Sequence, residues 1–430
     1  MSLPNIEPHM RATPGALPRT TLQREDAPLA ARRSPDLSNC FMLHGAAQSL
    51  AATGVHKPLF QDSTHALTGC CDTVLGALDP DWAAAPLLVG AMPFDRDAPC
   101  WLYQPQTMHT IDSLLAPKAA GCAPAGGDSA QVQAVPDRRS YQDMVRQATA
   151  RLGNGTAEAL RKVVLARSLE ISRTTPFDLR RLLRHLMNDA SITTYCLPLP
   201  GPARHAAASH LVGATPELLI TRRGKNIKSL PLAGSLPKQA NPMLDQAATR
   251  RLLQSAKDLQ EHRVVVEFIA DLLNPLCANL AVPAHPSLCS TASMWHLGTH
   301  INGTLKHPDD LATSSSLALA ARLQPTPALC GAPRDAALTL IRQLEPFERG
   351  FYGGTAGWSD NTGDGSWYVA IRCAEIQGPR ARLFAGAGIM HDSSPAAEAD
   401  ETAAKFSAML RALELEGLEL FPTLGNTASR

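Results

Sequence analysis

A glycine-rich strand followed by a helix, at residues 384–405, constrains this chain more than any other segment. The apolar run ARLFAGAGIM predicts a buried strand that ends near Gly386 and Gly388. A short loop then leads to Ser394-Pro395. This pair is typical of a helix start, because serine suits the N-cap and proline the first helical position. The segment therefore predicts a strand end packed beside the beginning of a helix.

Three charged side chains share one side of that predicted helix. Glu398, Glu401 and Lys405 stand at i, i+3 and i+7. Two carboxylates close together beside glycine-rich backbone can hold a hard divalent cation, with the lysine a turn away to meet an anion. The same spacing also fits a solvent-exposed surface on which Glu401 and Lys405 form an i, i+4 ion pair. The segment alone leaves both interpretations open.

The composition is that of an ordinary globular protein. The chain has 430 residues, 44% of them hydrophobic and 18% charged, which is enough for one large domain or two medium ones. A formal net charge of +1 gives no electrostatic case for nucleic acid or an anionic membrane as a partner. No apolar run is long enough to span a bilayer and no signal-peptide core is visible, so we expect a cytoplasmic protein. The ten cysteines include no CxxC pair and are expected to be reduced.

The chain divides into a tail and one large domain. Residues 1–39 are rich in proline and arginine with little apolar periodicity, which predicts a disordered tail, and residues 40–430 form the predicted domain. Residues 116–137 are predicted to be a surface loop, and residues 244–280 a long helical stretch broken near Pro275. Helix and strand signals alternate without a regular βαβ rhythm. This mixture favours an α+β fold with antiparallel sheets and helices packed outside.

Further motifs follow in order along residues 139–430. They are KVVLARSLEI with Lys162, GATPELLI with Glu217, PLAGS with Gly234 and Ser235, KDLQEHRVVV with Glu261, MWHLGTH with His296, PTPAL with Ala328 and Leu329, LEPFERGFYGG with Tyr352, VAIRCAEI with Arg372, and FAGAGI. This series resembles the chorismate-utilising enzymes, which include isochorismate synthase, salicylate synthase and the large subunit of anthranilate synthase. The likeness is weaker over residues 40–137. It is strongest to isochorismate synthases of siderophore pathways, in PTPALxG, LEPFxR and FAGAGI.

The resemblance implies two facing antiparallel β-sheets flanked by helices, with the active site in a cleft between them. It implies a magnesium-dependent isomerase that adds water at C2 of chorismate and removes the C4 hydroxyl, for the synthesis of a catecholate or salicylate siderophore. Salicylate synthase, which goes on to eliminate pyruvate, and a non-catalytic chorismate-binding protein are the alternatives. The implied partner is chorismate alone, in a monomer without a glutaminase subunit.

Two side chains are the candidates for proton transfer. Lys162 begins an otherwise apolar run, so its amine is expected to project into the cleft as the base that deprotonates water. The alternative is a lysine whose ammonium reaches solvent at the strand end. Anthranilate synthases, which use ammonia, usually have glutamine there, so the lysine indicates water, or the covalent lysine chemistry of aminodeoxychorismate synthase. Glu217 follows Pro216 at a strand end and is the candidate acid if burial raises its pKa; otherwise it is a surface carboxylate.

Carboxylates and cationic groups complete the implied site. Glu261 and Glu401 are the candidate magnesium ligands, with Glu398 close by, directly or through water. Arg372 stands alone in an apolar run and suits a carboxylate bidentately, so it is assigned to the pyruvyl carboxylate, with a buried structural ion pair as the alternative. Lys405 is expected to help to hold the C1 carboxylate.

The remaining candidates surround the substrate. Tyr352 is a second donor for the pyruvyl carboxylate, and His296 matches a family histidine near the ring. Backbone N–H groups are expected to approach the ligand at Gly234, Ser235, Gly386 and Gly388, and Ala328 and Leu329 agree with isochorismate synthases.

Two positions depart from the siderophore pattern. Gln324 stands where those enzymes usually have histidine, whereas isochorismate synthases of the menaquinone branch also have glutamine. Tyr352 replaces a common phenylalanine and resembles salicylate synthases. The resemblance therefore leaves the pathway and the final product open.

Overall fold

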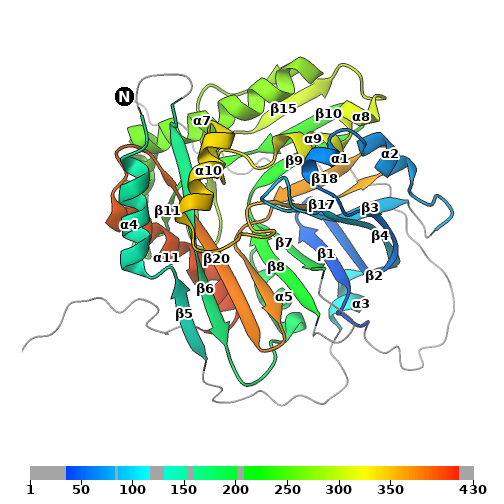
Figure 1. The fold of residues 1–430 in the computed structure, drawn as a ribbon, viewed down its shortest axis with the longest axis horizontal. Coiled ribbons are helices and arrows are strands. Elements are labelled where there is room, and N and C mark those ends of the chain that lie inside the picture. The colour runs from blue at the N-terminus through cyan, green and yellow to red at the C-terminus, as the bar shows by residue number, and fades with distance from the viewer. Residues whose placement is uncertain (1–34, 83–85, 117–129, 154–158, 201–207, 416–430) are drawn as a thin grey trace, which may run out of the picture. The chain divides into compact units, whose positions relative to one another are not determined.

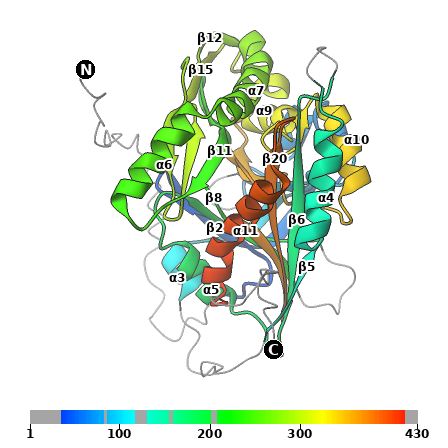
Figure 2. The ribbon, with the colours of Figure 1, turned by 90° about the vertical axis from the view of Figure 1, so that its left-hand side faces the viewer.

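Antiparallel strands form the framework of this protein, and helices cover them (Figures 1 and 2). The computed structural model describes residues 35–82, 86–116, 130–153, 159–200 and 208–415, all within one unit that begins at Ser34. Most of the expected tail lies outside these residues. Its last part is described, and Leu37 there is buried, with an exposed fraction of 6%. The predicted α+β class with antiparallel sheets flanked by helices is confirmed.

Seventeen strands of the described residues are hydrogen-bonded into one antiparallel sheet. In spatial order they are β12 (Cys277–Ala281), β15 (Ile301–Leu305), β10 (Asn226–Leu230), β9 (Leu218–Arg223), β18 (Gly365–Val369), β17 (Thr355–Asp360), β3 (Leu87–Met92), β4 (Trp101–His109), β2 (Gln48–Phe60), β1 (Cys40–Gly45), β7 (Thr193–Pro198), β8 (Ser209–Thr215), β19 (Cys373–Gln377), β20 (Arg380–Ile389) and β6 (Lys162–Ser172). The short strands β5 (Gln131–Val135) and β16 (Gly331–Ala332) both pair with β6.

Side chains from remote parts of this sheet meet in one apolar cluster. It includes Phe41 of β1, Val89 of β3, Ala166 of β6, Leu211 of β8 and Phe384 of β20. Strand β3 in the middle of the hydrogen-bonded order and strand β6 at its end both contribute to it, so the sheet folds over and its two parts face each other. A separate three-stranded sheet has the order β11 (Leu232–Pro237), β14 (Met294–Gly298) and β13 (Ser287–Ser290).

The helices pack around these sheets. They are α1 (Thr64–Leu67), α2 (Cys71–Gly76), α3 (Ile111–Leu115), α4 (Arg138–Thr149), α5 (Leu179–Leu186), α6 (Pro242–Gln254), α7 (Ala256–Leu273), α8 (Leu311–Ser314), α9 (Ser316–Leu323), α10 (Arg334–Leu344) and α11 (Pro395–Ala412), with a 3₁₀ turn at Asn274–Leu276. None of the described helices is long and apolar enough to cross a membrane. The described cysteines are all free thiols.

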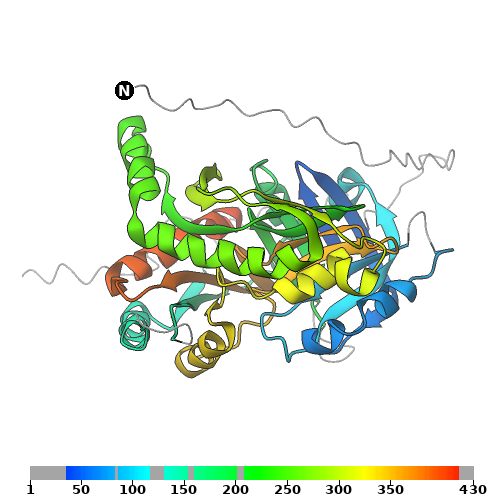
Figure 3. The same cartoon turned by 90° about the horizontal axis from the view of Figure 1, so that it is seen from above.

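The helix start at Ser394-Pro395 lies where the sequence predicted it, but Ser394 makes no capping hydrogen bond with its side chain. Two local predictions were wrong in part. The stretch 244–280 breaks near Pro275 as predicted, but its residues from Cys277 onward form β12. It also breaks at Ser255, which adopts an extended conformation and caps α7 by accepting from the Asp258 amide. The two helices therefore run in different directions (Figure 3). Within the predicted loop at 116–137, residues 117–129 lie outside the described residues, and Gln131–Val135 forms an edge strand on β6.

Candidate active site

The predicted substrate residues converge on one pocket beside β20, β11, α7 and α11. Its lining comprises Glu217, Gly234, Ser235, Glu261, His296, Ala328, Leu329, Tyr352, Arg372, Gly386, Gly388, Glu401 and Lys405, with Val164, Pro216, Leu232, Ala233, Ile371, Phe384 and Ala385. Two of the predicted site residues, Lys162 and Glu398, are buried next to lining residues and do not line the pocket themselves.

Helix α11 turns its charged residues toward β20 and the pocket. The Lys405 ammonium donates to the Gly386 carbonyl at 2.7 Å and pairs with Glu401 at 2.7 Å, and the Ser235 hydroxyl donates to Glu401 at 3.2 Å. Burial opposes ionisation of Glu401, but Lys405, Lys257 and the Ser235 hydroxyl outweigh it and lower the pKa of this carboxyl. The alternative of a solvated helix surface is therefore wrong.

Lys162 and Glu261 form a buried ion pair at the wall of the pocket. The Lys162 ammonium lies 2.9 Å from Glu261 Oε1, and the lysine side chain is fully buried, so the alternative in which it reaches solvent is wrong. A Cβ atom on Gly388 would lie 2.1 Å from Glu261 Oε1 and 3.0 Å from Lys162 Cε. Glycine is therefore needed at position 388 because any side chain there would overlap the ion pair. The predicted reason was a different one, the approach of a ligand to the Gly388 backbone.

Glu217 lies in the connection between β8 and β9, as predicted for a residue at a strand end. Its exposed fraction is 3%, which excludes the surface carboxylate. Burial raises the pKa of Glu217 to about 8, although a backbone hydrogen bond and the nearby Lys162, Lys405 and Arg372 act in the opposite direction. The carboxyl is therefore protonated at neutral pH and can donate a proton into the pocket.

Arg372 lies between β18 and β19, so the apolar run that contains it is not one continuous strand. Its φ of +50° is in the left-handed region, which is unfavourable for a residue with a side chain. The guanidinium lines the pocket and makes no ion pair within the described residues, so the alternative of a structural ion pair does not hold there. A strained arginine that faces a pocket without a counter-ion is suited to binding an anion.

His296, Tyr352 and Gly234 shape the rest of the pocket. His296 on β14 lies opposite Ser235 on β11. Burial, and the positive charges of Arg372 and Lys405, lower the pKa of His296 well below its usual value, so the imidazole ring is neutral. Its Nε2 atom is buried without a hydrogen-bond partner among the described residues, and a ligand can supply one. Tyr352 stacks on Phe384 with ring centroids 5.0 Å apart. Gly234, at φ +78°, forms a bulge in β11 that a side chain would strain.

This geometry agrees with the comparison to known proteins. Residues 104–414 match the family described as chorismate binding enzyme. The chain belongs to this family. The resemblance drawn from the motifs is thereby confirmed.

Individual chorismate-binding enzymes show how close the relation is. The chain is 40% identical to isochorismate synthase DhbC of Bacillus subtilis, over 83% of this chain and 88% of the relative. It is 36% identical to the vibriobactin-specific isochorismate synthase of Vibrio cholerae, over 87% of this chain and 92% of the relative. The crystal structure of a putative 2,3-dihydroxybenzoate-specific isochorismate synthase, DhbC, of Bacillus anthracis matches with a TM-score of 0.78 at 36% identity, covering 89% of this chain and 98% of that one.

The carboxylates of this chorismate-binding enzyme fit a magnesium ion with few protein ligands. No group of three or more His, Cys, Asp or Glu side chains in the described part of the chain is arranged to hold a metal. Glu261 on α7 and Glu401 on α11 both line the pocket, and one or two carboxylates completed by water and substrate oxygens suffice for magnesium. Glu398 does not line the pocket, which argues against a direct ligand role.

One charged residue at the site was not predicted. Lys257 pairs with Glu398 and so joins the first turns of α7 and α11. Burial, followed by repulsion from Glu401, raises the pKa of Glu398 to about 7, and Lys257 opposes this. The signal was present in KDLQE, because Lys257 precedes Glu261 by one helical turn and points to the same side of α7.

Proposed function

We propose that this protein is an isochorismate synthase of a siderophore pathway, an isomerase that converts chorismate to isochorismate by adding water at C2 with loss of the C4 hydroxyl. The observation that carries the proposal is the convergence of a buried neutral acid, a lysine–glutamate pair and an unpaired arginine on one pocket. Relatives named 2,3-dihydroxybenzoate-specific and vibriobactin-specific isochorismate synthases support both the reaction and the pathway.

Proton transfer is assigned to the two buried groups. Glu217 protonates the departing C4 hydroxyl, since burial keeps its carboxyl in the acid form at neutral pH. Lys162 takes the proton from the attacking water. Lys162 acts here as the neutral amine, and its burial at the pocket wall, away from solvent, supports this assignment. Water as the nucleophile removes the need for a glutaminase subunit.

Substrate binding is assigned to the cationic groups. The unpaired Arg372 guanidinium holds the pyruvyl carboxylate, assisted by the Tyr352 hydroxyl. Lys405 and the backbone around Gly386 lie next to the place proposed for the ring carboxylate. Glu261 and Glu401 would hold Mg²⁺. The positive charge of the bound ion would attract the C1 carboxylate and offset the repulsion between this carboxylate and the two glutamates.

A salicylate synthase is the second candidate. Tyr352, which resembles salicylate synthases, lies in the pocket wall and stacks on Phe384. That enzyme would form isochorismate first and then eliminate pyruvate in the same pocket.

Product analysis separates these functions. Purified protein is incubated with chorismate and magnesium without an ammonia source, and the products are separated by chromatography; a sample with a chelator in place of magnesium is the control. We expect a mixture of chorismate and isochorismate without pyruvate, and no conversion in the control. Salicylate with an equal amount of pyruvate would establish the second candidate, and unconverted chorismate would contradict both.

A further inference from the structure

One edge of β6 lacks a partner strand where it passes the pocket. On this edge β16 pairs with Lys162 and Val163, and β5 pairs with β6 only from Ser168 onward. Strand β20 covers the opposite edge from Val163 to Ser172. The Val164 carbonyl and the Ala166 amide lie in the gap. A buried backbone group without a partner costs on the order of 1–3 kcal/mol, so these groups need other partners.

Two side chains of the LEPFER motif fill this gap. The Arg349 guanidinium donates from Nη2 to the Val164 carbonyl at 2.8 Å, and Glu345 Oε1 accepts from the Ala166 amide at 2.7 Å. The two residues also pair with each other, with Arg349 Nε donating to Glu345 Oε2 at 2.8 Å. Both are buried, with exposed fractions of 8% for Glu345 and 4% for Arg349. The ion pair therefore takes the place of a short piece of strand.

The same arginine also holds two other parts of the pocket wall. Its Nη1 donates to the Leu329 carbonyl at 2.7 Å, and its own carbonyl accepts from the Tyr352 amide at 3.0 Å. Val164, Leu329 and Tyr352 all line the pocket. The buried guanidinium thus links β6, which carries the Lys162 base, to the PTPAL segment, and the backbone carbonyl of the same residue holds the tyrosine.

We propose that Glu345 and Arg349 are positioning residues, which fix the pocket wall at Val164, Leu329 and Tyr352 relative to Lys162 by standing in for a missing strand on β6. They do not line the pocket, and they act only through the backbone that they hold. This inference rests on the proposed function, because chorismate is the ligand used to test it.

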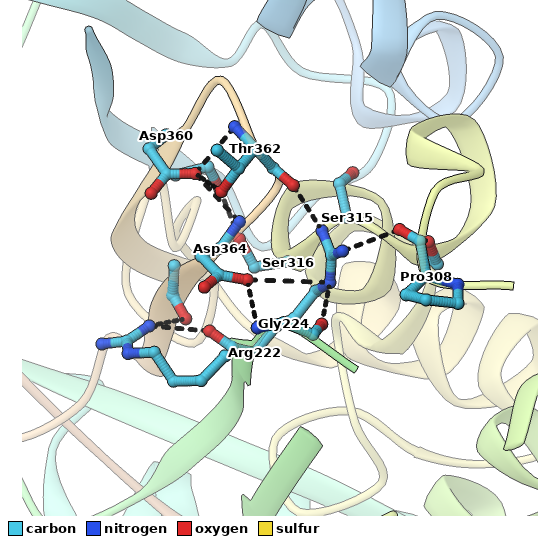
Figure 4. Close-up of polar contacts among 12 residues, drawn as sticks. Arg222, Gly224, Pro308, Ser315, Ser316, Asp360, Thr362 and Asp364 are labelled. Carbon is cyan, nitrogen blue, oxygen red and sulfur yellow. Dashed lines mark hydrogen bonds and ion pairs between the residues drawn. The ribbon is translucent and has the colours of Figure 1, made fainter. Parts of the chain in front are cut away.

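Arg222 provides a matched control. It is also buried, with an exposed fraction of 3%, and like Arg349 it donates to backbone carbonyls from remote segments. These are Thr362 at 2.9 Å and Pro308 at 2.7 Å, and it also donates to the nearby Gly224 carbonyl at 2.8 Å (Figure 4). None of these residues lines the pocket. Changing either arginine to lysine keeps the charge but removes the planar fork that reaches several oxygens at once.

The experiment compares Arg349→Lys with Arg222→Lys. Both variants are checked for folding by near-UV circular dichroism, and kcat and KM for chorismate are measured. We expect kcat/KM to fall by on the order of 100-fold in Arg349→Lys, because small displacements of reacting groups cost this much, and to stay at the parent value in Arg222→Lys. Parent-like values in Arg349→Lys, or an equal loss in both variants, would overturn the proposal.

Two further measurements keep the result decisive. If Arg349→Lys does not fold, Glu345→Gln takes its place, with a lowered kcat/KM expected and a parent-like value counting against the inference. Calorimetric titration with chorismate, with a chelator in place of magnesium, repeats the comparison without turnover, and we expect weaker binding for the variant at residue 345 or 349 but not for Arg222→Lys. A parent protein that binds chorismate without converting it would contradict the proposed function, while the binding comparison would still decide the inference.

Discussion

Lys162 and Glu217 are both buried ionisable residues, yet their surroundings prepare them for different tasks. The Lys162 ammonium has a carboxylate partner, Glu261, at 2.9 Å. Glu217 makes no ion pair within the described residues, so the loss of solvent dominates and the pKa of its carboxyl rises to about 8. The sequence identified both residues through their motifs. It could not give the depth at which they lie, because burial depends on β20 and α7, which are remote in the chain.

Replacing the proposed base should remove activity without unfolding the protein. We expect Lys162→Ala to lower kcat by roughly 10²–10⁴-fold, the usual contribution of a general base. Lys306→Ala is the control, since the Lys306 ammonium donates to the Pro275 carbonyl, away from the pocket. Turnover is measured by chromatography and folding by circular dichroism. Full activity in Lys162→Ala would remove it as the base.

The pH dependence of turnover should reveal the loss of the Glu217 proton. Its proton is needed for the C4 hydroxyl to leave, so activity requires the protonated carboxyl, which is present below a pKa of about 8 and is lost as the pH rises through that value. We expect kcat/KM, which reports ionisations of the free enzyme, to decline on the alkaline side accordingly. Glu217→Gln should have low activity throughout and lack this decline. A variant that keeps both the activity and the alkaline decline would contradict the assignment.

At the scale of elements, two helices present the carboxylates to the pocket. Glu261 lies on α7 and Glu401 on α11, and the ion pair of Lys257 with Glu398 joins the two helices one turn away. The start of α11 was predictable because serine–proline is a local signal. The break before α7 was not foreseen, although its cause, an extended Ser255 that caps the helix, is also local.

Glu401→Gln should weaken the dependence on magnesium. The amide keeps the shape of the side chain but loses the charge, so we expect the magnesium concentration for half-maximal activity to rise at least about tenfold. Glu398→Gln should raise this magnesium concentration less, because Glu398 does not line the pocket. Calorimetric titration with magnesium alone gives a second readout. An unchanged titration in Glu401→Gln would remove its ligand role.

At the scale of the whole molecule, the sheet brings together segments that no local pattern connects. Strand β6 pairs with β20 more than two hundred residues later, and their ladder places Val164 opposite Gly388. The alternation of apolar residues predicts that such strands are buried but does not name their partners. The family resemblance supplied that information for the fold and the site. The resemblance gave no role for the ion pair of Glu345 and Arg349. That role follows from the gap in the strand pairing of β6.

The boundary between tail and domain can be tested by truncation. We expect a chain that lacks residues 1–33 to match the full-length protein in unfolding temperature and turnover. A chain that lacks residues 1–39 also loses Leu37, which is buried and whose carbonyl accepts from His210 at 2.7 Å. Its free energy of unfolding should fall by about 2 kcal/mol or more, as for the loss of a buried leucine. Equal stability of the two truncated chains would contradict a domain that begins before Leu37.

The addition of water at C2 is the central chemical claim, and an isotope measurement tests it most directly. The reaction is run with chorismate and magnesium in water enriched in oxygen-18, and isochorismate is collected early and analysed by mass spectrometry. We predict that the new C2 hydroxyl carries the heavy isotope, because its oxygen comes from the solvent and the C4 hydroxyl leaves. Isochorismate without the label would contradict the proposed mechanism, and a chain that forms no isochorismate would contradict the proposed function itself.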